Sequence, residues 1–197
     1  MKWKFVVPGI PEEYFISEGN SMTKEEIRTI TLSKSRIKEE STVYDIGAGN
    51  GCISIEAALL AKRGKIFSIE KKPSRIEIIK ANAKRFNVKN MEVIEGEAPY
   101  ALENLPEADR IIIGGTGGKL REILFKCNEK LKDEGIVVIN AVTIDTLKDA
   151  VSSLEDLKFN FNITQVSINR AEKIGKNKIM KALNPVWIID ARKEEKD

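Results

Sequence analysis

Between residues 42 and 157, short runs of hydrophobic residues alternate with longer segments in which hydrophobic positions recur at steps of three and four. Near-continuous apolar strands that alternate with helices are typical of a parallel sheet that helices cover on both faces. The predicted strands are 43–46, 65–70, 91–95, 110–113 and 136–140. The predicted helices are 52–63, 74–86, 100–105, 119–132 and 144–157.

The N-terminal residues 1–21 show no clear period, and we expect an irregular N-terminal arm. Its aromatic side chains should pack on the rest of the protein, and they are Trp3, Phe5, Tyr14 and Phe15. The residues from Thr23 to Glu26 fit the capping box T-x-x-E, which predicts that a helix begins there.

The alternation of strands and helices ends after residue 157. The segments 159–170 and 186–191 are predicted strands with no helix between them, and a polar, basic connection over 171–181 joins them. We expect this C-terminal hairpin, residues 158–191, to close one sheet edge in antiparallel pairing. The predicted fold class is α/β, a Rossmann-like, doubly wound, mostly parallel sheet in one domain over residues 1–197.

Composition and charge exclude several classes of site. The 33 basic and 30 acidic residues leave a net charge of +3, which is too small for a nucleic-acid footprint. The absence of His excludes a His-based triad and His-ligated metals, and Cys52 and Cys127 cannot form a four-cysteine site. No apolar stretch approaches the ~18–20 residues of a membrane span, and the N-terminal run is too short for a signal peptide. We therefore expect a cytoplasmic protein with no membrane or nucleic-acid partner.

Three glycines, Gly47, Gly49 and Gly51, follow the first predicted strand where the chain turns into a helix. Ligands of open α/β sheets bind at the carboxyl ends of the strands, and glycine allows the backbone to contact them. The following helix N-terminus favours an anionic group. The dinucleotide fingerprint G-x-G-x-x-G would need glycine where this chain has Cys52. A tight turn that binds nothing is the alternative interpretation.

Acidic residues near the next strand ends narrow the ligand class. Glu70 ends the second strand and can accept hydrogen bonds from two ribose hydroxyls, which would suit NAD equally. Asp45 stands just before the glycines, where it can meet an ammonium group, and Glu97 follows the third strand beside the expected adenine. These features together describe S-adenosylmethionine. The alternative for Glu97 is a solvated loop carboxylate.

Two further loops supply candidate substrate contacts on the same edge of the predicted sheet. Four glycines surround Thr116 after the fourth strand, and we select Gly115, Thr116 and Gly117 as candidates, with a flexible connection as the alternative. Asn140 and Thr143 close the fifth strand, although Thr143 can also cap the next helix.

Several motifs together resemble a known family. The glycine motif D-I-G-A-G-N-G, the acidic second strand end and E-G-E-A are similar to those of class I, Rossmann-like methyltransferases. A set of six motifs resembles the cobalt-precorrin-6B C(15)-methyltransferase (decarboxylating) family of anaerobic cobalamin biosynthesis. These six are G-I-P at 9–11, M-T-K at 22–24, E-G-E-A-P at 95–99, I-G-G-T-G-G at 113–118, N-A-V-T at 140–143 and N-P-V at 184–186.

The resemblance implies an S-adenosylmethionine-dependent enzyme that methylates C-15 of a cobalt-precorrin and couples this to decarboxylation of the C-12 acetate side chain. It also implies a homotetramer. The glycine loop would hold the methionine end, Glu70 the ribose, and Ala98 with Glu97 the adenine, while Thr23 reaches in from the N-terminal helix. The implied cofactor contacts are Thr23, Gly47, Ala48, Gly49, Asn50, Gly51, Glu70, Glu97 and Ala98.

In this family the substrate is a cobalt-bearing tetrapyrrole with many carboxylates, and the macrocycle itself would hold the metal. Basic residues of the predicted connection can attract such a polyanion, although a solvated hairpin explains them equally well. They are Arg170, Lys173, Lys176, Lys178 and Lys181.

No side chain is assigned as catalytic, and we expect the protein to act mainly by positioning and desolvation. Two alternatives remain open from the sequence. One is a methyltransferase that acts on tRNA or protein with the same cofactor site. The other is a nucleotide-binding or scaffolding domain without catalysis.

Overall fold

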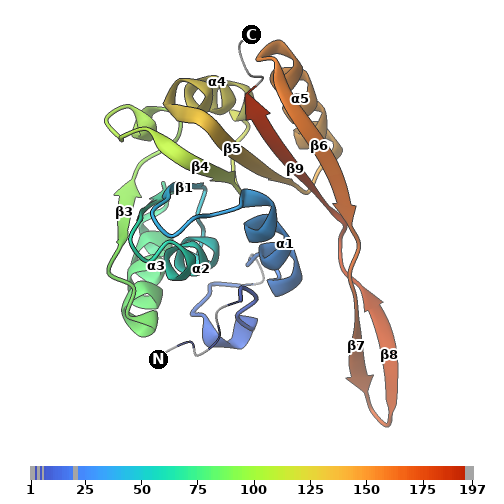
Figure 1. Ribbon diagram of the computed structural model, residues 1–197. Coiled ribbons are helices and arrows are strands. Elements are labelled where there is room, and N and C mark those ends of the chain that lie inside the picture. Colours follow the sequence, from blue (N-terminus) through green and yellow to red (C-terminus); the bar gives the residue numbers. More distant parts are fainter. Residues whose placement is uncertain (1–2, 4, 6, 20–21, 194–197) are drawn as a thin grey trace.

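A seven-stranded sheet with the order β3-β2-β1-β4-β5-β9-β6 forms the centre of the computed structural model, which describes residues 3, 5, 7–19 and 22–193 (Figure 1). Strands β1 to β5 run parallel, and β9 and β6 pair antiparallel at one edge. The strands are β1 (Thr42–Ile46), β2 (Lys65–Glu70), β3 (Met91–Glu95), β4 (Ala108–Ile113), β5 (Leu131–Ala141), β6 (Phe159–Val166) and β9 (Val186–Lys193). The strand order reverses beside β1, where open α/β sheets bind their ligands.

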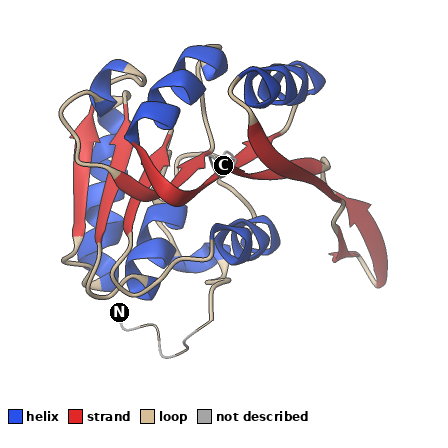
Figure 2. Ribbon diagram, turned by 45° about the horizontal axis from the view of Figure 1, so that its top comes forward, coloured by secondary structure: helices blue, strands red, loops and turns tan. Residues whose placement is uncertain are grey.

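Helices cover both faces of the sheet, as Figure 2 shows. They are α1 (Glu25–Ser35), α2 (Cys52–Leu60), α3 (Pro73–Phe86), α4 (Leu120–Lys130) and α5 (Ile144–Asp156), with short 3-10 turns at Glu12–Tyr14 and Tyr100–Leu102. One core lies between the sheet and α4 with α5, and another lies between the sheet and α1, α2 and α3. Successive strand residues serve opposite cores: Ile111 packs in the first and Ile112 in the second. Burial on both faces explains the continuous apolar runs, and the expected α/β fold class is confirmed.

The N-terminal segment is fastened to the body by a buried ion pair between α1 and α2. Arg28 Nε donates to Glu56 Oε1 at 2.8 Å, and both side chains are almost fully buried. The same carboxylate accepts the backbone N–H groups of Gly9 at 2.6 Å and Ile10 at 3.2 Å. The guanidinium of Arg28 also donates to the carbonyl oxygens of Ile10 and Thr23. These contacts fix the segment that leads into α1.

The expected packing of the N-terminal aromatic residues is confirmed for Trp3, Tyr14 and Phe15, which pack in or against one core, and is wrong for Phe5. Phe15 is buried, with its ring centroid 4.9 Å from that of Phe86, whereas Phe5 is 65% exposed. The predicted capping box is also wrong. Helix α1 begins at Glu25, so Lys24 and not Thr23 is the N-cap residue and no side chain caps the helix; Glu26 pairs with the distant Arg170.

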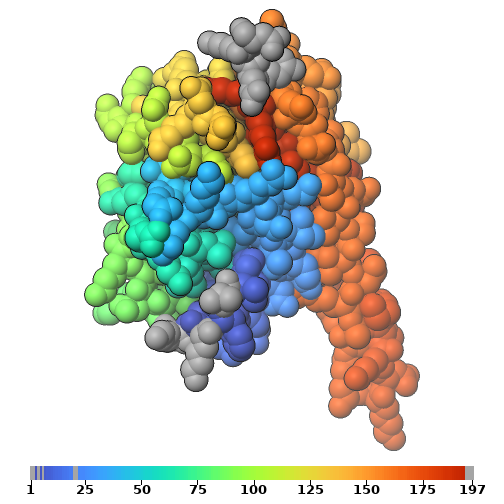
Figure 3. All heavy atoms as spheres, viewed as in Figure 1, coloured from blue at the N-terminus to red at the C-terminus, as the bar shows by residue number. Residues whose placement is uncertain are grey.

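The predicted C-terminal strands differ from the structure in one respect. The antiparallel pairing of β6 and β9 at the sheet edge is confirmed. The strand expected over 159–170 ends at Val166, however, and the connection expected over 171–181 is itself a hairpin. Strands β7 (Asn169–Ile174) and β8 (Asn177–Ala182) form a separate ribbon that projects from the body in Figures 1 and 3. The ribbon was not predicted because its sequence is rich in lysine and lacks the alternation of apolar and polar residues that a half-buried strand shows. Every residue of β8 is exposed.

Candidate functional site

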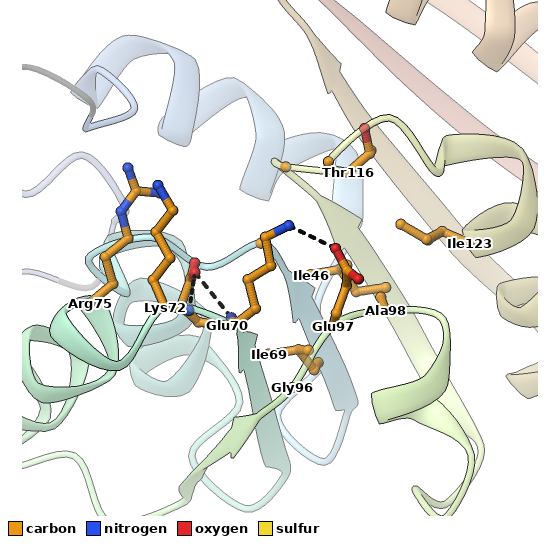
Figure 4. Close-up of a pocket in the computed structure, with 14 residues that line it drawn as sticks. Ile46, Ile69, Glu70, Lys72, Arg75, Gly96, Glu97, Ala98, Thr116 and Ile123 are labelled. Atoms are coloured by element: carbon orange, nitrogen blue, oxygen red, sulfur yellow. Dashed lines mark hydrogen bonds and ion pairs between the residues drawn. The ribbon is translucent and has the colours of Figure 1, made fainter.

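A pocket lies at the carboxyl ends of the parallel strands, where the strand order reverses. Its volume is about 560 Å³, which includes space open to solvent. Figure 4 shows its lining residues, which come from the ends of β1 and β2, from the loops after β1, β2, β3 and β4, and from α3 and α4. The lining residues are Ile46, Gly47, Ile69, Glu70, Lys71, Lys72, Arg75, Gly96, Glu97, Ala98, Gly115, Thr116, Gly117 and Ile123.

The glycine loop after β1 is packed against the loop after β4. Gly47 has a φ of +74°, and a Cβ at this position would lie 2.4 Å from the carbonyl oxygen of Gly115, so only glycine fits. The Gly47 N–H donates to the Ile69 carbonyl at 3.0 Å, which fixes the loop to β2. Around Gly49, which also has positive φ, no atom lies within 4 Å of the position of a Cβ. The loop therefore leaves open space at Gly49.

Glu70 is held in a fixed orientation at the end of β2. It is 5% exposed, and its Oε2 accepts the Gly49 N–H at 2.9 Å. Its Oε1 accepts the N–H groups of Lys71 and Lys72, each at 3.0 Å. A carboxylate offers about four acceptor positions, so these three bonds leave it able to accept a further hydrogen bond from a ligand hydroxyl.

Glu97 lies between two lysines at the mouth of the pocket. Its Oε1 is 2.7 Å from Lys71 Nζ, and its Oε2 is 2.6 Å from Lys119 Nζ. Hydrogen bonds from Lys119 and Lys71 lower the pKa of the Glu97 carboxyl to about 2, and the bond to Glu97 raises the pKa of Lys119. Glu97 and Lys119 are therefore both charged at neutral pH.

Asp45 lies below the glycine loop and does not line the pocket. It is 1% exposed, and its Oδ2 accepts a hydrogen bond from Ser54 Oγ at 2.5 Å. Its Oδ1 has no hydrogen-bond partner among the residues that the structure describes. Burial raises the pKa of this carboxyl to about 6, although the Ser54 bond opposes the shift. Contact between Asp45 and an ammonium group stays a prediction.

The other predicted cofactor contacts surround the glycine loop without lining the pocket. Asn50 Nδ2 lies 2.9 Å from Met22 Sδ, which joins the loop to the segment before α1. Next to Met22, Thr23 is held through its carbonyl oxygen by the guanidinium of Arg28. Gly51 is the N-cap residue of α2, with a φ of 78°. The positions of Ala48, Gly49, Asn50 and Gly51 agree with a loop that borders a ligand, and their cofactor contacts stay a prediction.

The predicted substrate residues separate into two groups. Gly115, Thr116 and Gly117 line the pocket. Asn140 is instead buried under α1, with its Oδ1 2.9 Å from Thr31 Oγ1. Thr143 caps α5, because its hydroxyl accepts the Thr146 N–H at 3.1 Å. The alternative role that the sequence allowed for Thr143 is therefore the one seen.

Sequence reasoning missed the basic and aliphatic part of the pocket. Lys71 and Lys72 directly follow Glu70, so their positions could have been found from that neighbour. Nothing local indicated that Lys119 reaches Glu97, since that contact joins separate loops. The aliphatic side chains of Ile46, Ile69 and Ile123 were missed as well.

The cysteines offer no nucleophile. Cys52 and Cys127 are both free and buried. Burial raises the pKa of the Cys52 thiol to about 12 and raises the pKa of Cys127 as well. Over the described ranges, no group of three or more Cys, Asp or Glu side chains is placed to hold a metal ion. No helix in the same residues has the length and apolarity needed to cross a membrane.

Known proteins resemble this chain over nearly its whole length. The family model for the "Precorrin methyltransferase domain" matches residues 13–193. A protein of Saccharolobus solfataricus named "Probable cobalt-precorrin-6B C(15)-methyltransferase (decarboxylating)" is 41% identical over 198 residues, 98% of this chain and 100% of that protein. A protein of the same name from Pyrobaculum calidifontis is 38% identical over 97% of this chain and 99% of its own length.

Solved structures of precorrin enzymes also resemble this chain over nearly its whole length. The crystal structure of precorrin-6y C5,15-methyltransferase from Geobacter metallireducens has a TM-score of 0.91 and 40% identity, and it covers 95% of this chain and 99% of its own. Precorrin 8w decarboxylase of Methanobacterium thermoautotrophicum has a TM-score of 0.86 at 31% identity, over 92% and 98% of the two chains. A tRNA (m1A58) methyltransferase from Aquifex aeolicus, at 16% identity and a TM-score of 0.77, shares the fold.

Proposed function

The chain belongs to the precorrin methyltransferase family, and on that premise we propose that it transfers a methyl group from S-adenosylmethionine to C-15 of a cobalt-precorrin. Loss of CO₂ from the C-12 acetate side chain accompanies the transfer. The observation that carries this proposal is the Glu70 carboxylate, which the Gly49 N–H holds toward the pocket.

The residues present fit S-adenosylmethionine. Glu70 can accept one further hydrogen bond, from a ribose hydroxyl, and the open space at Gly49 leaves room for a ligand against the backbone. Glu97 and Ala98 line the side of the pocket assigned to adenine. Loop 47–51, with Asn50 beside it and Thr23 nearby, is assigned to the methionine end.

When bound, S-adenosylmethionine supplies an electrophilic methyl group. The chain then needs to hold two reactants in line, and fixed geometry of this kind contributes at best on the order of 7–11 kcal/mol to lowering the barrier. Ile46, Ile69 and Ile123 present aliphatic surface that excludes water from the pocket. Glu97, with its pKa of about 2, is a poor proton acceptor. These properties support positioning and desolvation as the contribution of the protein.

The experiment is incubation of the protein with methyl-labelled S-adenosylmethionine and a cobalt-precorrin pool, followed by mass spectrometry. We expect a product that has gained one methyl group and lost CO₂. Glu70→Ala should weaken S-adenosylmethionine binding at least tenfold by calorimetry, since hydrogen bonds to charged groups contribute about 1.5–3 kcal/mol each. Glu95→Ala, the exposed register neighbour on β3, is the matched control.

Two results would contradict the proposal. Cofactor binding without methyl transfer to any tetrapyrrole in the pool would remove the assigned reaction. Equal calorimetric affinity of the Glu70→Ala variant would remove the assigned cofactor seat. Transfer to tRNA or protein is supported by shared fold alone, and the net charge of +3 does not favour it.

The projecting ribbon supports a homotetramer. A two-stranded ribbon is marginally stable by itself in water, and this one exposes Ile174, Ile179 and Met180. Contacts with other copies of the chain would cover these side chains. The two free, buried thiols fit a reducing compartment, and we place the enzyme in the cytoplasm, without membrane or nucleic-acid partners.

A further inference from the structure

Two lysines from separate loops share one carboxylate at the mouth of the pocket. Lys71 follows β2, Lys119 precedes α4, and Glu97 between them follows β3. Each lysine binds a different oxygen of Glu97, at 2.7 and 2.6 Å. The two lysines and one glutamate together therefore carry a formal net charge of +1.

This cluster is accessible and adjoins the glycine loop after β4. The side chains of Lys71, Lys119 and Glu97 are 48%, 36% and 35% exposed. A Cβ on Gly117 would lie 3.2 Å from Lys71 Nζ and 3.5 Å from Glu97 Oε1. The loop that borders the pocket thus lies directly against the ion cluster.

The surplus positive charge has no counterpart in S-adenosylmethionine. The sulfonium is itself a cation, ribose and adenine are neutral, and the carboxylate of the methionine end is assigned to the glycine loop. Lys72 also lines the pocket, whereas the nearby Glu70 already accepts three backbone N–H groups. The charge therefore fits the second substrate, since a tetrapyrrole with carboxylate side chains is a polyanion.

We propose that Lys119 is a specificity-determining residue that receives a side-chain carboxylate of the tetrapyrrole, while Lys71 keeps Glu97 paired. This inference rests on the proposed function, because it assumes a polycarboxylate tetrapyrrole. The two Glu97 oxygens are bound by different lysines, so departure of Lys119 leaves the carboxylate with one partner. Lys119 Nζ also lies 5.5 Å from the ring centroid of Tyr100, which is 73% exposed, so Lys119 is held at the surface beside Glu97, which lines the pocket.

The test compares Lys119→Met with Lys126→Met. Lys126 lies on α4, seven residues after Lys119, and pairs with Glu129 at 2.7 Å, so the control also removes one paired lysine. The ligand is uroporphyrin, a tetrapyrrole with eight carboxylates, titrated by fluorescence quenching in the presence of S-adenosylhomocysteine. We expect about tenfold weaker uroporphyrin binding for Lys119→Met, and no change for Lys126→Met. Lys119→Arg should restore most of the affinity because it keeps the charge.

A parallel measurement of methyl transfer separates binding from catalysis. Lys119→Met should raise KM for the cobalt-precorrin about tenfold while kcat changes less than twofold, and added salt should reduce this difference. Equal uroporphyrin affinity in the two Met variants would overturn the inference. So would failure of the wild-type protein to bind uroporphyrin while it methylates a cobalt-precorrin, which leaves the proposed function standing. A wild-type protein that binds uroporphyrin through Lys119 but transfers no methyl group would support the inference and contradict the proposed function.

Discussion

A buried carboxylate with one hydrogen-bond donor lowers the stability of a protein at neutral pH, and Asp45 is such a group. Its pKa is raised from 3.8 to about 6, so the folded protein binds the proton more tightly than the unfolded chain does. Because of this difference, the free energy of unfolding should fall as pH rises from about 4 to 6, and it should stay lower above that range. One pKa unit corresponds to about 1.4 kcal/mol, so the whole effect of this shift is on the order of 3 kcal/mol.

Asp45→Asn should therefore stabilise the protein at pH 8 and change stability little at pH 3, below both pKa values. The Asn oxygen can still accept the hydrogen bond from Ser54, while the cost of burying a charge disappears. Urea unfolding at the two pH values measures the effect, with the exposed Asp133→Asn as control. An equal difference at both pH values would show that the charge of Asp45 is not the cause.

Alanine substitutions at Gly49 and Gly175 can distinguish the effect of backbone strain from the effect of ligand contact. Both have positive φ, +63° and +59°, and at neither position would an added Cβ have another atom within 4 Å. Alanine should cost about 1–2 kcal/mol of folding stability at each site. Only Gly49→Ala should also weaken S-adenosylmethionine binding, by tenfold or more in calorimetry, because its methyl group would project into the proposed cofactor seat. Equal cofactor affinity for the two variants would contradict that assignment.

At the scale of elements, the N-terminal segment depends on the ion pair between α1 and α2. Glu56→Gln leaves Arg28 buried without its charged partner, and removal of one member of such a pair costs about 3–5 kcal/mol. We expect a loss of that size in urea unfolding. The amides of Gly9 and Ile10 should exchange hydrogen faster, because both donate to Glu56.

The matched control for this element is Glu77→Gln on α3. Glu77 forms an exposed pair with Lys80, and such pairs contribute about 0–1 kcal/mol. Glu56 also orients Arg28, whose guanidinium donates to the carbonyl oxygen of Thr23. If Glu56→Gln displaces Arg28, Thr23 loses this contact, and cofactor binding should weaken as well. If both variants lose equally little stability, the ion pair is not what fastens the segment.

The local pattern of apolar and polar residues predicted the parallel strands well, but it predicted poorly which helices and strands contact one another. Strands β2 and β3 begin and end at the predicted residues. For β2, burial on both faces gives a run of apolar positions that no exposed helix produces. The predicted capping box is absent, and Glu26 pairs with Arg170, far away in sequence. Strands β7 and β8 were missed because neither strand packs on the sheet.

The same distinction applies to the candidate site. The glycine loop and Glu70 could be predicted because a strand end and its following turn are contiguous in the chain. The Lys71–Glu97–Lys119 cluster could not be predicted, because its members meet only when three loops converge. The burial of Asn140 against Thr31 was hidden for the same reason, since α1 and β5 lie far apart in sequence.

For the whole molecule, the β7–β8 ribbon is the part least explained by a single chain. It stands away from the body in Figure 3, and Met180 is 65% exposed. At its base, Arg170 binds Glu26 Oε1 through Nε at 2.9 Å and Glu12 Oε1 through Nη2 at 2.8 Å. The base is thus held to the N-terminal segment and α1, and the tip extends beyond the packed part of the protein.

If the ribbon joins copies of the chain, a charge on its apolar positions should separate them. Ile179→Asp and Met180→Asp should each reduce the mass measured by light scattering from that of a tetramer of 22.1-kDa chains to a smaller species. Because both side chains are exposed within one chain, the folding stability of that chain should change by about 0.5 kcal/mol or less. Phe125→Asp on α4, another exposed apolar position, should leave the mass unchanged. A wild-type mass of one chain would exclude the ribbon as an assembly element, and tetramers that survive both ribbon substitutions would place the interface elsewhere.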